Sequence, residues 1–186
     1  MQPDGPILGF DTSGPWCAVG GLSAPAIAEG MERGQAERLF PLIEAYLACA
    51  GTAWDRLRAI GVGIGPGNFT GVRIGVAAAR GLALSLGIPA VGVSTFDLML
   101  GETPPRGAIL ISLPALHGAA NVQTYRDGWP IGPPALLTPG EARPELREAG
   151  LAVLGFEAER IAAALGAATA RPVPPPDPVQ IGDRIA

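Results

Sequence analysis

The chain has 186 residues, of which 48% are hydrophobic and 16% charged, so it has enough apolar side chains for a packed core and is not a disordered chain. Its formal net charge of -4 argues against a protein that binds nucleic acid through a basic face of its own. All thirteen basic residues are arginines, which excludes a phosphate-loop lysine, a Schiff-base lysine and a lysine general base.

The N-terminal part of the chain predicts a meander followed by a helix. Short apolar runs separated by turn residues predict three strands, at residues 7–11, 16–22 and 26–32. A helix is expected over residues 36–50, because apolar residues recur there at helical spacing and Gly51 follows as a C-terminal glycine does.

The next part predicts a strand, helix, strand succession. Residues 59–65 read as a buried strand, 72–87 as a helix and 88–94 as a further strand, with a glycine-rich loop between the first two. A succession of this length is a βαβ unit with parallel pairing, so the fold class is α/β. The first domain is expected to span residues 1–100.

The remainder, residues 101–186, predicts a second and smaller domain. Two strands are expected around 108–113 and 121–126, with a turn at Asp127 and Gly128. Beyond them the sequence predicts, in order, a short helix at 141–150, a buried strand at 151–155, a helix at 157–168 and an extended proline-rich tail from 170 to 178.

Several kinds of site are disfavoured by what the sequence contains. Cys17 and Cys49 lack the spacing of a redox or zinc motif, so both are interpreted as reduced structural thiols. His117 is the only histidine, which excludes paired histidine ligands; it is read as a loop residue, with a catalytic role as the alternative. There is no GxSxG nucleophile motif. We therefore expect neither a metal nor a cofactor.

The location of the protein is predicted from its apolar stretches. The N-terminus lacks a basic segment followed by an apolar one, so nothing in it directs export. The longest apolar stretch, residues 74–86, contains Arg80 and is shorter than the roughly 20 residues that a membrane span needs. We expect a cytoplasmic protein without a membrane segment.

A glycine-rich loop, GIGPGNFTGVRIG at residues 63–75, precedes the second helix. It lacks the lysine of a phosphate loop and the third glycine of a dinucleotide motif. Two interpretations stay open: an anion site at the helix N-terminus, or a tight turn in which Asn68 or Thr70 caps the helix. Asp11, which ends the first predicted strand, is either part of a phosphate-contacting turn like that of actin-like ATPases or the acceptor of a hydrogen bond within its own turn.

Small residues recur every fourth position along the second helix, at Gly71, Gly75, Ala79, Ala83 and Gly87. Such a strip lets another element approach the helix closely. Glycine inside a helix costs about 0.5–1 kcal/mol relative to alanine, so some contact is expected to offset it. The strip packs either within its own domain or, on the sharper hypothesis, at a subunit interface.

Four segments together resemble one protein family. They are ILGFDTSG (7–14), GQAERLFPLIEAYL (34–47), GVGIGPGNFTGVRIGVAAARGLALSLGIPAVGVSTFD (61–97) and PVQIGDRIA (178–186). The third is the specific one, and the pattern resembles the bacterial TsaB family, also called YeaZ. The resemblance implies an actin-like (ASKHA, RNase H-like) fold with two lobes, of which the second is shortened here.

The resemblance also implies a function and partners. It implies a non-catalytic subunit needed for threonylcarbamoyladenosine modification of tRNA, which stabilises a TsaD-type transferase paralogue by heterodimerisation. A TsaE-type ATPase would join through the complex, homodimers would form through the first-lobe helices, and no direct tRNA binding is expected. The alternatives are an independent actin-like ATPase, tested by ATP hydrolysis lost on Asp11→Ala, and a glycoprotease-type peptidase.

Site residues follow from matching positions. Asp11, Thr12 and Ser13 match a vestigial nucleotide turn; the glycine loop comprises Gly65, Pro66, Gly67, Asn68, Phe69, Thr70, Gly71 and Arg73; the partner interface on the two helices comprises Leu39, Ile43, Tyr46, Gly75, Ala79 and Ala83. The sequence departs from the family pattern at Gln35 (often His), at Asn68 (usually Ser), at residues 114–116 (PAL for DAR) and at residues 155–157.

Overall fold

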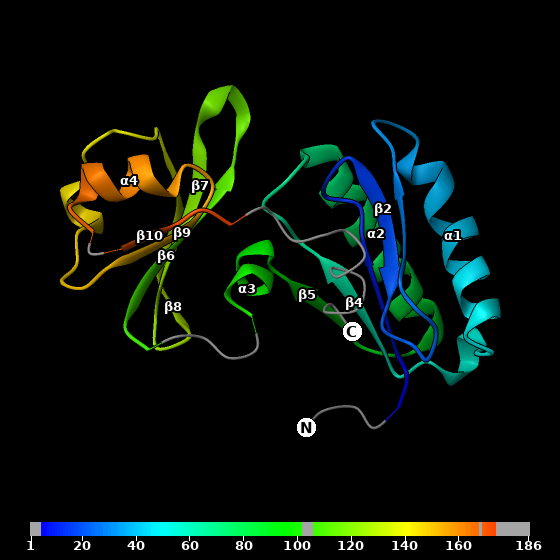
Figure 1. Cartoon of the computed structure of the whole chain (residues 1–186). Coiled ribbons are helices and arrows are strands. Elements are labelled where there is room, and N and C mark those ends of the chain that lie inside the picture. The colour runs from blue at the N-terminus through cyan, green and yellow to red at the C-terminus, as the bar shows by residue number, and fades with distance from the viewer. Residues whose placement is uncertain (1–4, 102–105, 168, 174–186) are drawn as a thin grey trace. The chain divides into compact units, whose positions relative to one another are not determined.

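The structure is a computed structural model that describes residues 5–101, 106–167 and 169–173. The described residues form two compact units that divide between Leu98 and Met99, and each unit contains one five-stranded sheet (Figure 1). The sequence placed this boundary after Leu100.

The sheet of the first unit combines an antiparallel meander with a parallel half. Its strand order is β3-β2-β1-β4-β5. Strand β1 pairs antiparallel with β2, which pairs antiparallel with β3, whereas β4 is parallel to both β1 and β5. The strands are β1 (Ile7–Asp11), β2 (Trp16–Gly20), β3 (Ile27–Gly30), β4 (Ala59–Gly63) and β5 (Ala90–Val93). The predicted meander and βαβ unit are both present.

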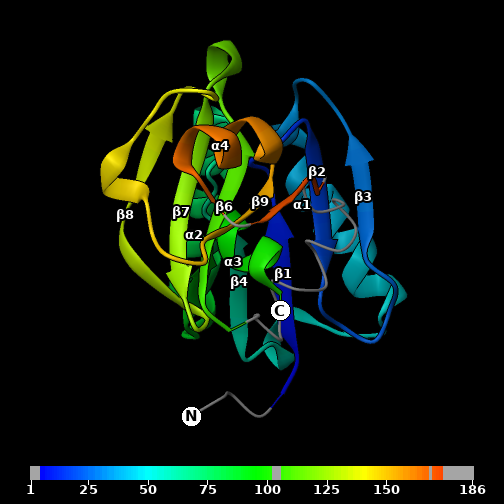
Figure 2. The ribbon, with the colours of Figure 1, turned by 60° about the vertical axis from the view of Figure 1, so that its left-hand side comes forward.

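Two helices cover one face of this sheet. Helix α1 (Gln35–Cys49) packs on β2, helix α2 (Phe69–Leu86) packs on β4, and the two helices contact each other (Figures 1 and 2). Both helices end at glycines in the left-handed conformation, Gly51 (φ 60°) after α1 and Gly87 (φ 68°) after α2. A short 3-10 helix, η1 (Trp54–Arg56), connects α1 to β4.

The core of the first unit lies between this sheet face and the two helices. Alternating strand residues point toward the helices, as the period of two requires. Helix α1 contributes Tyr46, whose hydroxyl donates to the carbonyl of Ala24 (2.9 Å) and accepts from the amide of Leu22 (2.9 Å). The buried apolar residues are Leu8, Phe10, Cys17, Val19, Leu39, Leu42, Ile43, Tyr46, Leu47, Leu57, Ile60, Val62 and Ala79.

The second unit has the strand order β10-β9-β6-β7-β8, with helix α4 (Ala158–Leu165) packed on β9 and β10. A two-residue Asp127-Gly128 turn joins β7 to β8, and both turn residues have positive φ (51° and 87°), as predicted from the Asp-Gly pair. The strands are β6 (Ala108–Pro114), β7 (Ala120–Arg126), β8 (Trp129–Leu137), β9 (Ala152–Gly155) and β10 (Thr169–Arg171).

Some elements differ from the expectation. The helix expected at 141–150 is only a 3-10 turn, η3 (Pro144–Leu146). Strand β8 was not predicted, because three prolines interrupt its pattern. Strand β10 includes the first two residues of the segment that was expected to be an extended proline-rich tail, and residues 174–178 of that segment lie outside the described residues. The remaining elements are helix α3 (Thr95–Leu100) and the 3-10 turn η2 (Leu116–Gly118).

Candidate functional site

The turn after β1 is buried and hydrogen-bonded to itself. Asp11, Thr12 and Ser13 are 1%, 1% and 4% exposed. The Asp11 carboxylate accepts hydrogen bonds from the Trp16 indole Nε1 (2.6 Å), the Ser13 hydroxyl (3.0 Å) and the Ser13 amide (3.2 Å). Asp11 therefore makes the hydrogen bond within its own turn that the sequence left as one alternative, and Trp16, which the sequence did not single out, is a partner of its carboxylate.

Burial controls the titration of this region. It raises the pKa of Asp11 above its ordinary value, although the hydrogen bonds from Trp16 and Ser13 act in the opposite direction. Burial, with smaller contributions from Glu29 and Asp11, raises the pKa of the Cys17 thiol to about 12. Cys17 is consequently an inert thiol in the core, as expected for a structural cysteine.

The glycine loop lies directly against this turn. A Cβ on Gly67 would collide with the carbonyl oxygen of Ser13, and one on Gly71 with that of Thr12. The Asn68 amide donates to the Ser13 carbonyl (2.6 Å), and the Thr12 hydroxyl donates to the Gly71 carbonyl (2.7 Å). The glycines are required here because two backbone segments touch.

Several backbone amides at the N-terminus of α2 have hydrogen-bond partners within the unit. The Asn68 Oδ1 accepts from the amides of Thr70 (2.9 Å) and Gly71 (3.1 Å), which makes Asn68 the N-cap residue. The amides of Asn68, Thr70 and Gly71 are therefore bonded within the unit. Of the two interpretations of the loop, the structure has the tight turn capped by Asn68, and these amides are not presented to an anion.

The outer part of the loop is exposed. Phe69 is 67% exposed, and the Arg73 guanidinium carbon lies 3.6 Å from the centroid of its ring. Gly65 has a φ of 77° and its carbonyl accepts from the Thr95 amide (2.9 Å), whereas Pro66 is half-buried. The loop is thus anchored at both ends, to α3 and to the turn after β1.

The strip of small residues on α2 faces the unit itself. Gly71, Gly75 and Ala79 are buried, and a Cβ on Gly75 would lie 2.9 Å from the Thr12 Oγ1 and 3.4 Å from Val62 Cγ2. Ala83 is half-buried and Gly87 is exposed. The packing of this strip is therefore within its own domain, the first of the two alternatives.

This burial corrects the predicted interface. Gly75 lies against the unit's own turn and sheet, Ala79 is buried in its core, and Leu39, Ile43 and Tyr46 are 0–1% exposed there. A periodic apolar or small face marks the side of a helix that packs closely, but it does not say which body covers it. The exposed apolar surface of these two helices lies on another face.

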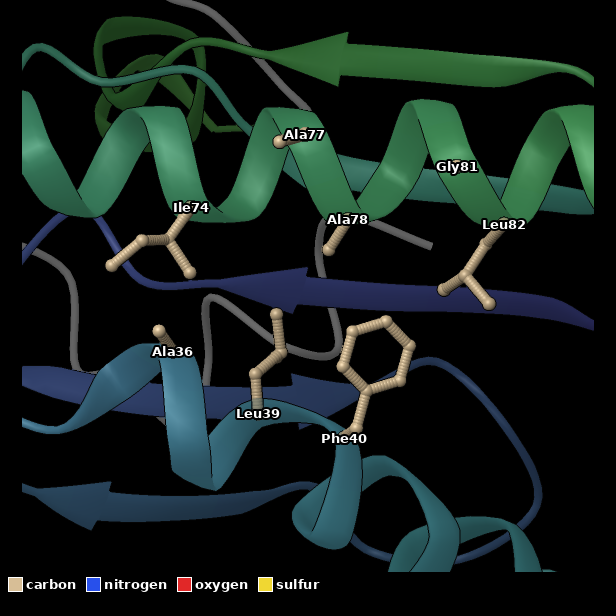
Figure 3. A pocket seen from close by; sticks show the side chains of 8 residues that line it. All are labelled: Ala36, Leu39, Phe40, Ile74, Ala77, Ala78, Gly81 and Leu82. Carbon is tan, nitrogen blue, oxygen red and sulfur yellow. The ribbon is translucent and has the colours of Figure 1, made fainter.

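That surface is an apolar groove between α1 and α2 with a volume of about 580 Å³. Figure 3 shows side chains of both helices directed into the space between them. Phe40 is 43% exposed, and Ala77 and Gly81 are exposed as well. The lining residues are Ala36, Leu39, Phe40, Ile74, Ala77, Ala78, Gly81 and Leu82. Apart from Leu39, the sequence analysis did not identify these residues. The signal that could have found them is Phe40, a large apolar side chain beside the predicted core face.

Helix α2 is more apolar than its burial explains. It has a mean hydropathy of 1.3, only 17% of it is buried, and it is long and apolar enough to cross a membrane by length and composition alone. It connects two paired strands, β4 and β5, and its Gly75 and Ala79 are buried against the unit. Leu84, at 87% exposed, belongs to its outer surface.

Two of the positions where the sequence departs from the family pattern, Gln35 and Gly155, make close contacts within their own units. The Gln35 side chain donates to the carbonyl of Met31 (3.1 Å) and lies 3.5 Å from that of Gly14, so it fastens the start of α1 to the strand region. Gly155, at φ 113°, lies against the Ser112 carbonyl. His117 is an exposed loop residue with φ 58°. Within the described ranges, no three His, Cys, Asp or Glu side chains are grouped to hold a metal.

Comparison with known proteins decides the family. Residues 24–116, half of the chain, match the model of the TsaD family, described as tRNA N6-adenosine threonylcarbamoyltransferase. The chain belongs to the TsaD/TsaB family. It is 38% identical over 96 residues to the tRNA threonylcarbamoyladenosine biosynthesis protein TsaB of Escherichia coli, covering 50% of this chain and 42% of that protein. The corresponding TsaB of Haemophilus influenzae is 35% identical over 96 residues, with coverages of 50% and 41%.

In these sequence matches the chain spans less than half the length of its curated TsaB relatives. Solved structures match over more of the chain. YeaZ from Pseudomonas aeruginosa has a TM-score of 0.68 at 25% identity, covering 96% of this chain and 90% of that one. Another Pseudomonas aeruginosa structure, of an uncharacterized protein with similarity to peptidase YEAZ, has a TM-score of 0.68 at 28% identity, with coverages of 91% and 82%. The predicted α/β fold of the actin-like (ASKHA, RNase H-like) class is confirmed.

Proposed function

We propose that this chain is a non-catalytic TsaB-like subunit needed for threonylcarbamoyladenosine modification of tRNA. It stabilises a TsaD-type transferase by forming a heterodimer through the α1–α2 groove. The observation that carries this proposal is the open apolar groove on a pair of helices that both lie inside the region matched by the TsaD model, residues 24–116. A TsaD-type protein is therefore expected to carry an equivalent helix pair, which can lie across the groove and cover it.

The closed turn after β1 supports the non-catalytic part of the proposal. A nucleotide phosphate would need free amides at the α2 N-terminus, and the Asp11 carboxylate would have to be free to hold a cation or a water molecule beside it. The amides of Thr70 and Gly71 are bonded to Asn68, and Trp16 and Ser13 occupy the Asp11 carboxylate. Both groups serve the packing of the unit itself.

The remaining partners belong to the same proposal. A TsaE-type ATPase joins through the complex, and the helix face that binds the transferase also allows a homodimer. Direct tRNA binding is not part of the proposal, because the chain carries a net charge of -4 and has no lysine. A cytoplasmic location fits this role.

Two rival functions have less support. An independent actin-like ATPase requires the Asp11 turn to open, and ATP hydrolysis by the purified chain that is lost on Asp11→Ala would establish it. A peptidase is suggested only by the name of one structural neighbour, and the described residues offer no grouped metal ligands. Cleavage of a protein substrate by the purified chain would establish that alternative.

Binding to the TsaD-type transferase of the same organism tests the proposal. Ala77→Arg and Gly81→Arg place a charged side chain in the groove, and each is expected to weaken binding at least about tenfold. Ala170→Arg, at an exposed site on β10 in the second unit, is the matched control and should bind normally. Full binding by both groove variants would overturn the interface, and full tRNA modification without this chain would overturn the function.

A further inference from the structure

Four charged residues border the groove without an ion-pair partner. Glu37 and Glu44 lie on α1, Arg73 and Arg80 lie on α2, and all four are exposed. None of them takes part in the ion pairs found among residues 5–101, 106–167 and 169–173. The Arg38–Glu29 pair, in contrast, is satisfied inside the unit.

The two charges on each helix form a row along it. They are seven residues apart on both helices, which is about two turns and about 10.5 Å along the axis. At about 100° per residue, both glutamates lie within about 60° of Phe40, and both arginines lie within about 60° of Ala77. Phe40 and Ala77 line the groove on α1 and α2 respectively. The groove therefore has an acidic border on α1 and a basic border on α2, with equal spacing.

We propose that these two borders select the partner of the groove and fix its register. The occupant is the helix pair of the TsaD-type transferase, which presents two acidic residues to Arg73 and Arg80 and two basic residues to Glu37 and Glu44. This inference rests on the proposed function and adds the chemistry of its partner. Complementary charges at the rim of an apolar interface speed association and exclude partners of like charge.

The equal spacing explains how the register is set. A partner with the same spacing makes both contacts on each border in one alignment only. A shift along the helix axis by one turn, about 5.4 Å, breaks the alignment of the rows, while the apolar contacts of alanine and glycine tolerate sliding. The charges thus supply the specificity that a groove lined by small side chains does not supply by itself.

The test measures the rate at which the full chain associates with the transferase at about 0.1 M and about 1 M salt, which shortens the Debye length from about 10 to about 3 Å. Arg73→Glu/Arg80→Glu and Glu37→Arg/Glu44→Arg reverse one border each. Each is expected to slow association at least about tenfold at the lower salt, and to reduce the salt dependence of the rate.

Matched controls change the net charge by the same amount elsewhere. Arg56→Glu/Arg171→Glu and Asp55→Arg/Glu159→Arg alter exposed residues away from the groove, and both are expected to stay within about twofold of the unmodified chain. All eight positions are exposed, so the variants should fold, which their thermal unfolding verifies. The unmodified chain should itself associate with the transferase more slowly at the higher salt concentration. An association rate that does not depend on salt would contradict the inference.

The outcomes separate this inference from the proposed function. If Ala77→Arg prevents binding while both border reversals bind normally, the charge selection is wrong and the interface stands. If none of these variants affects binding, the interface itself is wrong. If the two reversed chains associate with each other but the unmodified chain does not bind the transferase, the occupant is a second copy, which overturns the choice of partner.

Discussion

The two sides of helix α2 behave differently although they belong to one helix. On the inner side, Gly71, Gly75 and Ala79 lie against the turn after β1 and strand β4, and no space is left. On the outer side, Ala77 and Gly81 border a groove with a volume of about 580 Å³. Both sides carry small residues, so residue size alone does not distinguish a packed face from a binding face. The contacts made by each residue distinguish them.

The largest expected difference between the two sides of α2 is in the free energy of unfolding when one glycine on each side is replaced by alanine. Gly71→Ala places a methyl group against the Thr12 carbonyl and is expected to reduce the free energy of unfolding by about 3 kcal/mol. Gly81→Ala meets nothing within 4 Å and is expected to raise it by about 0.5–1 kcal/mol through helix propensity. Urea unfolding measures both changes, and equal effects would show that the two sides do not differ.

A second prediction concerns the closed turn. Trp16→Phe removes the indole N–H that donates to the buried Asp11 carboxylate, and is expected to cost about 1–3 kcal/mol of unfolding free energy. Trp129→Phe is the control, because Trp129 is 77% exposed on β8, and it should be nearly neutral. Similar losses in the two variants would mean that the hydrogen bond to Asp11 does not stabilise the turn.

A third prediction concerns the start of α2. Asn68→Ala removes the cap of two backbone amides and is expected to cost about 1 kcal/mol, while Asn68→Ser, which keeps a capping oxygen, should cost only a few tenths. Thermal unfolding measures the difference. If the alanine variant gained affinity for inorganic phosphate, the freed amides would form an anion site after all, and the closed description of this end would need revision.

The smallest expected effect is a dependence of stability on pH. Because the pKa of Asp11 is raised in the folded state, the folded chain binds this proton more strongly than the unfolded chain does. The contribution is therefore present below the unfolded value of about 3.9 and is lost as the pH rises through the folded value. Asp11→Asn should remove this loss, so the stability of the variant should fall less than that of the unmodified chain over the same pH range. Parallel profiles would contradict the assignment.

Local patterns predicted much of the fold. The Asp127-Gly128 turn and the βαβ unit follow from turn chemistry and periodicity, which act over a few residues. For the cap of α2 the sequence left Asn68 and Thr70 as alternatives, and the structure has Asn68. Strand β8 was not predicted because its prolines weaken the strand pattern. It forms because it pairs with β7, and this pairing cannot be read from the sequence of β8 alone.

The candidate site was harder to predict than the fold. Periodicity identified α1 and α2 and their packed faces. Gly75 and Ala79, however, were predicted to contact a partner chain, and the structure buries both within their own unit. Gly75 fits against Thr12, which is more than sixty residues earlier in the chain, and such a contact has no local signal. The groove that contains Phe40 is formed by α1 and α2 together, so the sequence of neither helix alone predicts it.

The burial of Cys17 has a practical consequence for work on this protein. Its sulfur is fully covered and its pKa is about 12, whereas Cys49, the only other cysteine, is exposed at the last residue of α1. A maleimide dye added to the native chain should consequently attach at one position. Fluorescence from that position would follow the end of α1 as a partner arrives, with no substitution introduced into the sequence.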